Sequence, residues 1–286
     1  YPDPSPAPVV SGGAVPTAVS VPTTFEFTVG SWNVQRFFDT DNDPTLSEPV
    51  LTAAAFANRL NKASLAIRNS LNFPDILGVA EVENASTLQS LAIKINTDAI
   101  AASQPNPSYV AYLAEGNDPG GIDVGFLVKT ALVDGVNPRV GNVVVIQEGL
   151  STTYINPVNN TAELLNDRPP LRLTATVRHP GGATFPVTVI MNHLRSLNGI
   201  NDETPPVPPA LATEGARVRA KRRAQAEFLA GLVQAHIAEN LVVMGDFNAF
   251  ELNDGYVDVM GTVEGAPTPD TQVVAASGDL VNPNLV

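Results

Sequence analysis

Hydrophobic positions recur at two different spacings in the first third of the chain. Phe25, Phe27 and Val29 alternate with polar residues, and this two-residue period predicts a strand that runs into Trp32-Asn33. Between residues 56 and 71 the apolar residues lie three or four positions apart, which predicts a helix with Thr52 as its N-cap. Residues 39–50 are polar and contain two prolines, so they predict a loop, and the apolar run 74–82 is typical of a buried strand.

The same patterns continue through the rest of the chain. Ser86 is the expected N-cap of a second helix, in which Leu88, Leu91 and Ile95 share one face. Residues 198–213 hold four prolines and predict a surface excursion, which a basic helix follows. Further strands are predicted at 109–113, 122–128, 140–147, 171–177, 187–192 and 241–244, with a hairpin turn at 179–182.

Helices separate some of these strands, whereas hairpin turns join others. This mixture predicts a layered α/β sandwich rather than a purely parallel sheet. Residues 1–22 are rich in Pro, Ala, Ser and Val and predict an extended lead-in, so the expected domain covers residues 23–286.

Composition narrows the possible functions. The chain has 286 residues, of which 44% are hydrophobic, and this is typical of a globular protein. A net charge of -13 argues against a passive nucleic-acid-binding module, but an enzyme can take its positive charge from bound cations. The absence of cysteine excludes disulfides, thiol catalysis and cysteine-ligated zinc. No run of residues is long and apolar enough to predict a membrane span.

Four polar clusters follow four of the predicted strands. Alone, each is typical of a turn or of a hydrogen-bonded core residue, but four together indicate an active site. Carboxylates suit Mg²⁺, Mn²⁺ or Ca²⁺, and histidine can donate to a phosphoryl oxygen, so these residue types indicate a metal-assisted phosphoester site. The clusters are Ser31-Trp32-Asn33, Glu81-Val82-Glu83-Asn84, Asn192-His193-Leu194-Arg195 and Gly245-Asp246-Phe247-Asn248.

In order and spacing, these clusters resemble the motifs of the endonuclease/exonuclease/phosphatase superfamily. The likeness covers residues 25 to about 260, and it departs from the usual pattern at Ala80, where the family has Gln before the metal-binding Glu. The strongest match is the GDFN motif at residues 245–248. Residues 81–84, residues 168–171 and the basic helix are most similar to the secreted bacterial nuclease branch.

The resemblance implies a four-layer α-β-β-α sandwich of two packed mixed sheets flanked by helices. It implies that Glu81 binds Mg²⁺ (or Mn²⁺ or Ca²⁺) with Asn33 alongside, and that Glu83 is a second ligand or supports the first. Asp246 and Asn248 would orient the attacking water and hold the phosphate, and His193 would donate to a non-bridging oxygen. Arg168 is either a phosphate contact or a surface arginine before a strand.

The family ends with a strand that bears an Asp and then with an Asp-His pair that supplies the catalytic base. Residues 249–286 contain no His, so we expect this chain to lack the last strands of the family's fold and to be nearly inactive as a hydrolase.

The leading prediction for function is a metal-dependent nuclease that acts on DNA or RNA, with a secreted or periplasmic location. A phosphatase or phosphodiesterase acting on a small or lipid phosphate is one alternative, and a non-catalytic binding protein on the same scaffold is another. The basic residues at 217–223 would either meet a nucleic-acid backbone or form the solvated face of their helix.

Overall fold

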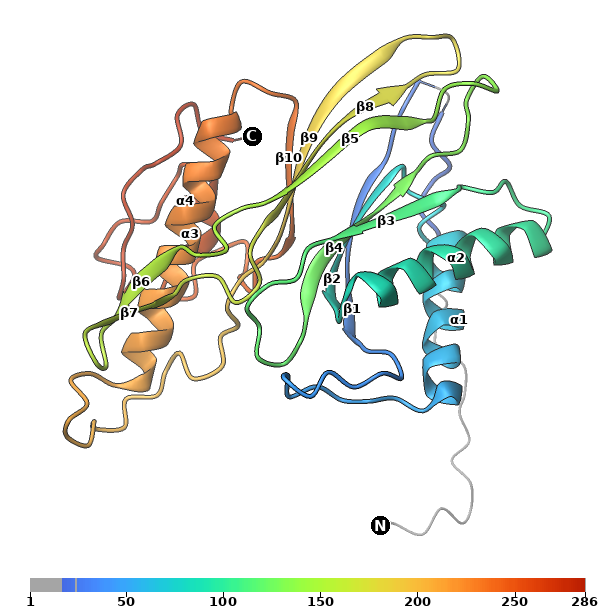
Figure 1. The fold of residues 1–286 in the computed structure, drawn as a ribbon. Helices are drawn as coiled ribbons and strands as arrows, with labels where there is room; N and C mark the ends of the chain where they lie inside the picture. Colours follow the sequence, from blue (N-terminus) through green and yellow to red (C-terminus); the bar gives the residue numbers. More distant parts are fainter. Residues whose placement is uncertain (1–16, 24, 286) are drawn as a thin grey trace.

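Two four-stranded mixed sheets pack face to face in the computed structural model, which describes residues 17–23 and 25–285 (Figure 1). The first sheet has the order β1-β2-β4-β3, built from Val29–Phe37, Ile76–Val82, Asp123–Lys129 and Tyr109–Leu113. The second has the order β10-β9-β8-β5, built from Leu241–Asp246, Thr184–His193, Leu171–Arg178 and Val140–Gln147. In each sheet the first two strands are parallel and the others antiparallel.

Helices cover the outer face of each sheet. Helices α1 (Ala53–Asn69) and α2 (Ala85–Ala101) pack on the first sheet, and α3 (Glu214–His236) and α4 (Val259–Glu264) pack on the second (Figure 1). Buried residues such as Phe126, Leu173 and Met191 fill the space between the sheets. The predicted four-layer α-β-β-α sandwich is therefore confirmed.

Local signals in the sequence set most element boundaries. Thr52 caps α1 as predicted, because its hydroxyl accepts a hydrogen bond from the amide of Ala55. The predicted cap of α2 is wrong by two residues. Asn84 is the N-cap, and its side-chain oxygen accepts from Thr87 N at 2.8 Å, whereas Ser86 already lies within the first turn. An N-cap needs extended backbone so that its side chain can reach back to the helix, and Asn84 has it.

The first strand starts later than its hydrophobic alternation suggests. It begins at Val29, and Phe25 is 87% exposed with its ring stacked on His179. Before Val29, Thr28 and Asp75 exchange side-chain-to-backbone hydrogen bonds of 3.0 and 3.1 Å, so strand pairing starts only at Val29 and Ile76. Beyond Asn33 the strand continues through a bulge to Phe37.

The remaining strand predictions agree with the structure within a few residues, and the hairpin turn at 179–182 is confirmed. Two elements had no predicted counterpart: the hairpin of β6 (Thr153–Asn156) with β7 (Thr161–Leu164), and helix α4. Most of the predicted lead-in at 1–22 lies outside the described residues, and its described part, 17–22, forms no helix or strand. Between β10 and residue 285, the described chain contains α4 and no further strand.

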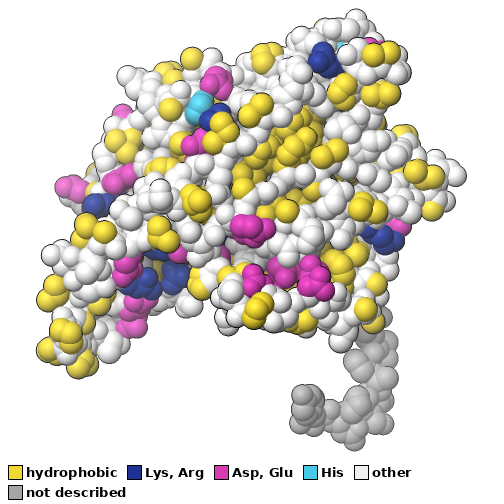
Figure 2. Space-filling view, viewed as in Figure 1, with side chains coloured by type: hydrophobic (Ala, Val, Ile, Leu, Met, Phe, Trp, Pro, Cys, Tyr) yellow, Lys and Arg dark blue, Asp and Glu magenta, His cyan; other side chains and the backbone are white. Residues whose placement is uncertain are grey.

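Charged side chains are spread unevenly over the surface. On the face shown in Figure 2, acidic side chains outnumber basic ones, and the main group of Lys and Arg, at the lower left, has acidic side chains beside it. Among the described residues, no helix combines the length and the apolar character that crossing a membrane would require.

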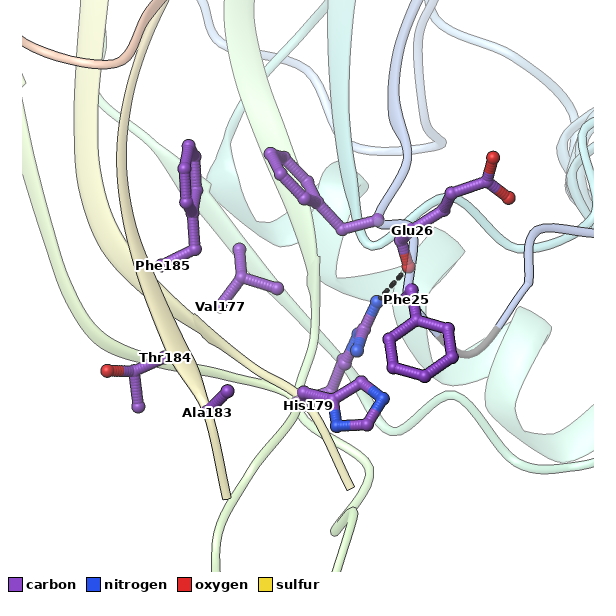
Figure 3. A pocket seen from close by; sticks show the side chains of 9 residues that line it. Phe25, Glu26, Val177, His179, Ala183, Thr184 and Phe185 are labelled. Atoms are coloured by element: carbon purple, nitrogen blue, oxygen red, sulfur yellow. Dashed lines mark hydrogen bonds between the residues drawn. The ribbon is translucent and has the colours of Figure 1, made fainter. Parts of the chain in front are cut away.

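A cleft of about 240 Å³ opens between the sheets where β1 and β9 begin (Figure 3). Phe25, Phe27, Val177 and Phe185 give it an apolar lining, and His179 lies at its edge. This places His179 at the opposite end of these strands from Asn33 and His193.

Candidate metal centre

Each sheet brings the carboxyl ends of its parallel strand pair to one edge of the sandwich. In the first sheet, β1 carries Asn33 and β2 ends next to Glu81 in the same direction. In the second, β9 ends at His193 and β10 ends at Asp246, which are register partners. Because β1 and β10 are in contact across the sandwich, the four side chains come from distant parts of the sequence to one place.

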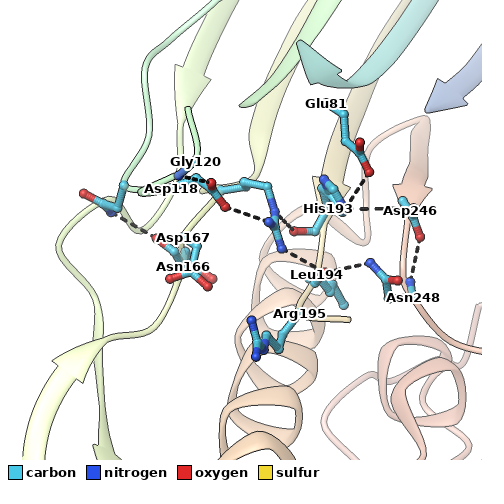
Figure 4. A network of polar contacts seen from close by, with 12 residues as sticks. Glu81, Asp118, Gly120, Asn166, Asp167, His193, Leu194, Arg195, Asp246 and Asn248 are labelled. Atoms are coloured by element: carbon cyan, nitrogen blue, oxygen red, sulfur yellow. Dashed lines mark hydrogen bonds and ion pairs between the residues drawn. The ribbon is translucent and has the colours of Figure 1, made fainter. Parts of the chain in front are cut away.

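The amide of Asn33 joins the two halves of this cluster. Its Nδ2 donates to Glu81 Oε1 at 2.8 Å and to Asp246 Oδ2 at 2.9 Å. His193 Nε2 lies 4.0 Å from Glu81 Oε1 and 3.9 Å from Asp246 Oδ2 (Figure 4). One side-chain atom each from Glu81, His193 and Asp246 therefore lies within 4.8 Å of the other two.

Bulges at the ends of β1 and β2 set the direction of the Glu81 carboxylate. Glu81 falls where the register of β2 shifts against β4, and its φ is +65°. In the bulge of β1, Gln35 and Arg36 also have positive φ, and Arg36 N donates to Glu81 Oε2 at 2.8 Å. Left-handed backbone in such residues costs on the order of 1–3 kcal/mol each. The structure places this strain beside the carboxylate, where bulges commonly redirect a side chain.

A tight turn holds Asp246 and Asn248. Gly245 has φ +137°, and a Cβ at this position would lie 2.0 Å from the Asn192 carbonyl oxygen, so only glycine fits. Asn248 N donates to Asp246 Oδ1 at 2.9 Å, and its Nδ2 donates to the Leu194 carbonyl at 3.0 Å. The GDFN segment is thus tied to the residue that follows His193.

His193 is a buried histidine beside two carboxylates. Burial lowers its pKa, the nearby Arg168 guanidinium lowers it further, and Asp246 acts in the opposite direction. The imidazole is therefore neutral near pH 7 and carries one N–H. No described residue hydrogen-bonds to its Nδ1. The other two histidines lie elsewhere: His179 is in the β8–β9 turn, and His236 at the end of α3 contacts Glu239.

Arg168 supports the backbone at the end of β9. Its guanidinium donates to the carbonyls of His193 at 3.2 Å and Leu194 at 3.3 Å, and it pairs with Asp118 at 2.7 Å (Figure 4). Only 10% of its side chain is exposed, so the alternative of a surface arginine is wrong. Its predicted contact with a phosphate stays a prediction.

Two other buried carboxyl groups lie near the strand ends without joining this cluster. Glu83 accepts hydrogen bonds from Asp39 N and from Thr87, and burial first, with Asp39 and Glu48 adding to it, raises its pKa to about 7. Asp123, at the start of β4, has its pKa raised to about 8, chiefly by burial and also by the neighbouring Glu115 and Asp118. Among the described residues, neither belongs to a group of three with metal-ligand spacing.

The basic segment of α3 fits neither of its two predicted roles as a whole. Arg219, Lys221 and Arg222 are buried rather than solvated. They pair with Glu203 at 2.6 Å, Asp167 at 2.7 Å and Asp254 at 3.6 Å. These acidic partners lie in distant loops, so the segment mainly holds the outer helix against those loops.

Two carboxylate oxygens and one imidazole nitrogen make a donor set that fits a divalent cation. Oxygen donors suit Mg²⁺, Mn²⁺ and Ca²⁺, and imidazole is tolerated best by the transition metals. Glu81 and Asn33, the predicted metal residues, lie together, and the geometry adds His193 and Asp246 to the same group. Asn248 lies next to it through its bond to Asp246.

Comparison with known proteins gives a match to a family model and distant likenesses of fold to solved structures, two of which are described below. The model described as Endonuclease/Exonuclease/phosphatase family matches residues 30–270. No curated protein sequence matches the chain.

Among solved structures, the chain is similar to ANGEL2, described as a 2',3'-cyclic phosphatase, with 14% identity, 79% of this chain and 53% of that chain covered, and a TM-score of 0.37. It is also similar to an endonuclease/exonuclease/phosphatase protein from Beutenbergia cavernae DSM 12333, with 18% identity, coverages of 79% and 48%, and a TM-score of 0.43. The chain spans about half the length of these structures.

Proposed function

The chain belongs to the endonuclease/exonuclease/phosphatase family, a family of phosphoesterases, and we propose that it is a divalent-metal-dependent phosphodiester hydrolase acting on DNA or RNA. One observation carries the proposal: carboxylates from two different sheets, Glu81 and Asp246, share the amide of Asn33 and lie about 4 Å from a neutral His193. Without a cation between them, these carboxylates would repel both each other and a phosphodiester.

In this proposal, the carboxylates of Glu81 and Asp246 hold the cation, Asn33 fixes the orientation of both, and His193 Nε2 lies about 4 Å from each as a hydrogen-bond donor. When bound, a divalent cation supplies positive charge that polarises a phosphoryl oxygen. Asp246, held by Asn248 N, orients the attacking water, and the Asn248 side chain faces the phosphate. The single N–H of neutral His193 donates to a non-bridging oxygen, so it stabilises charge that grows in the transition state.

The choice of nucleic acid as the substrate rests on the likeness of residues 81–84, 168–171 and the helix at 214–236 to secreted bacterial nucleases. The same likeness makes a secreted or periplasmic location part of the proposal. A phosphatase or phosphodiesterase acting on a small or lipid phosphate would use the same cation site, because the chemistry at phosphorus is shared. The substrate panel below separates these possibilities.

The test compares the chain with its Glu81→Gln variant, which keeps the side-chain shape and removes one negative charge. Substrates are single-stranded and duplex DNA, RNA, p-nitrophenyl phosphate and a phosphoinositide headgroup, each with Mg²⁺, with Mn²⁺ or with EDTA. We expect weak, cation-dependent cleavage of nucleic acid by this chain, lowered in kcat by roughly a further 10²-fold or more in Glu81→Gln. Glu264→Gln, the same change at an exposed residue of α4, is the matched control.

The outcomes separate the alternatives. Undiminished hydrolysis in EDTA would refute the proposed requirement for a divalent cation. Turnover restricted to the small phosphates would move the assignment to a phosphatase. Cation binding with no turnover of any substrate would favour a binding protein on this scaffold.

A further inference from the structure

Two arginines, one from a helix on each side of the sandwich, contact the backbone around the metal centre in the same way. Arg59 of α1 donates to the carbonyls of Gln35, at 2.7 Å, and Arg36. Arg222 of α3 donates to the carbonyls of Asn248, at 2.9 Å, and Arg195. We propose that Arg59 and Arg222 are positioning residues, each fixing the backbone that presents one sheet's share of the metal centre. This inference rests on the cation site of the proposed function.

On the first sheet, Arg59 binds the residues whose backbone amides hydrogen-bond to Asn33 and Glu81. Its two acceptor residues are the left-handed Gln35 and Arg36 of the β1 bulge. The amides of the same two residues donate to the site: Gln35 N to Asn33 Oδ1 at 2.9 Å, and Arg36 N to Glu81 Oε2 at 2.8 Å. The Arg59 guanidinium therefore binds the carbonyls of the same two strained residues whose amides hydrogen-bond to the side chains of Asn33 and Glu81.

Arg59 has little else to hold it in this place. No described carboxylate lies within 4.0 Å of its guanidinium, so it is outside the ion pairs that engage most basic residues of the chain. Its Cζ also lies 6.0 Å from the centroid of the Phe37 ring. The two carbonyls are thus its main polar partners, and a planar fork of donors suits a pair of acceptors.

On the second sheet, Arg222 ties together the two loops that leave β9 and β10. Arg195 comes two residues after His193, and Asn248 comes two residues after Asp246. Nearly one turn further along α3, Gln225 accepts from Arg195 N at 2.7 Å and strengthens the same attachment. Displacing either loop would move a side chain of the metal centre.

The burial of Arg222 shows that this contact is retained at a cost. Its side chain is fully buried, and burial lowers its pKa. Among the described residues, the one carboxylate within 4.0 Å is that of Asp254, at 3.6 Å and without a hydrogen bond. A buried guanidinium with so distant a counter-charge is costly, and its two hydrogen bonds to carbonyls are what compensate that cost.

The test measures Mn²⁺ affinity by titration calorimetry and Tm by thermal denaturation, on the full chain and without substrate. The variants are Arg59→Lys, which keeps the charge but loses the fork, and Arg222→Met, which keeps the volume but loses the charge. We expect both to bind Mn²⁺ about tenfold more weakly, because groups that orient metal ligands typically contribute 10–100-fold. Arg222→Met also leaves two carbonyls and Asp254 without this partner, so its Tm should fall, and Mn²⁺ affinity is therefore measured well below the Tm of every variant. A purely structural role would leave the Mn²⁺ affinity of the folded fraction unchanged.

Lys62→Arg in α1 and Arg223→Lys in α3 are matched controls on the exposed faces of the same helices, and they should bind Mn²⁺ within twofold of the parent chain. Parental affinity in both Arg59→Lys and Arg222→Met would overturn the inference, as would a loss that only follows the unfolded fraction. If the two variants lose Mn²⁺ affinity while the parent hydrolyses nothing in the substrate panel, the inference stands and the proposed function fails. A parent chain that binds no Mn²⁺ would overturn both.

Discussion

Replacing Gly245 with alanine tests whether the close approach of β10 to β9 at this residue fixes the position of Asp246. The added Cβ would lie 2.0 Å from the Asn192 carbonyl oxygen and 2.8 Å from two further backbone atoms of Asn192. An ordinary contact between such atoms is above roughly 3.2 Å, so one of the two strands must move by about 1 Å. Both strands carry site residues, because His193 directly follows Asn192 and Asp246 directly follows Gly245.

The expected cost has two parts. Placing alanine at φ +137° costs on the order of 1–3 kcal/mol, and the backbone clash adds a similar amount, so we expect a loss of roughly 3–5 kcal/mol. At about 2–4 °C per kcal/mol for a chain of this size, Tm should fall by roughly 10 °C. A 1 Å displacement at the reacting groups should also lower kcat by about 10²-fold.

Gly182→Ala separates the two parts. Gly182 has φ +91°, but a Cβ there meets nothing within 4 Å, so this variant has the conformational cost without the clash. Thermal denaturation and Mn²⁺ titration of both variants give the comparison. Equal losses of Tm, with Mn²⁺ affinity kept in Gly245→Ala, would show that the strands yield and that their close approach at Gly245 does not determine the position of Asp246.

Two further predictions concern other groups near the strand ends. Burial raises the pKa of Asp123 to about 8, whereas the unfolded chain releases this proton near pH 4. The protonated carboxyl therefore contributes stability that is fully present below pH 4 and is lost as the pH rises through 8. Asp123→Asn should therefore raise the unfolding free energy at pH 8 by up to about 6 kcal/mol (about four pKa units), with the difference shrinking toward pH 4. A constant difference in denaturant titrations across this range would contradict the assignment. His193→Ala and Asn248→Ala should each lower kcat by about 10²–10³-fold while changing KM little, because their contacts are proposed to strengthen in the transition state. A change confined to KM in steady-state kinetics would show that either residue only binds substrate.

Much of the fold is predictable because its signals are local. Strands β3 and β5 agree with their predicted bounds at both ends, since each is an apolar run between turn-forming residues. The β6–β7 hairpin is harder to find, because each strand has only four residues, of which two are exposed in β6 and three in β7. The start of β1 depends on the distant pair Thr28 and Asp75, and no period along the chain contains that information.

The metal centre, like the fold, can be predicted from the sequence only in part. Asn33, Glu81, His193 and Asp246 each follow an apolar run, so their meeting at strand ends can be expected from the sequence. The bulges that set the direction of the Glu81 side chain cannot be predicted from the sequence, because Glu and Arg have no preference for the left-handed backbone that they adopt there. The ion pairs of α3 are similarly hidden, since their acidic partners are brought close only by the fold.

The symmetry of the two sheets explains why the metal centre lies between them. Each parallel pair contributes one carboxylate and one neutral group, Glu81 with Asn33 and Asp246 with His193, so neither sheet alone holds two anionic ligands. The distance between the sheets therefore decides whether the site exists. In β2, three residues before Glu81, a Cβ on Gly78 would lie 2.5 Å from Met244 and 2.6 Å from Met191. The side chains of Met191 and Met244 fill the space beside Gly78, so the strands β2, β9 and β10 that carry site residues also contribute to the core between the sheets.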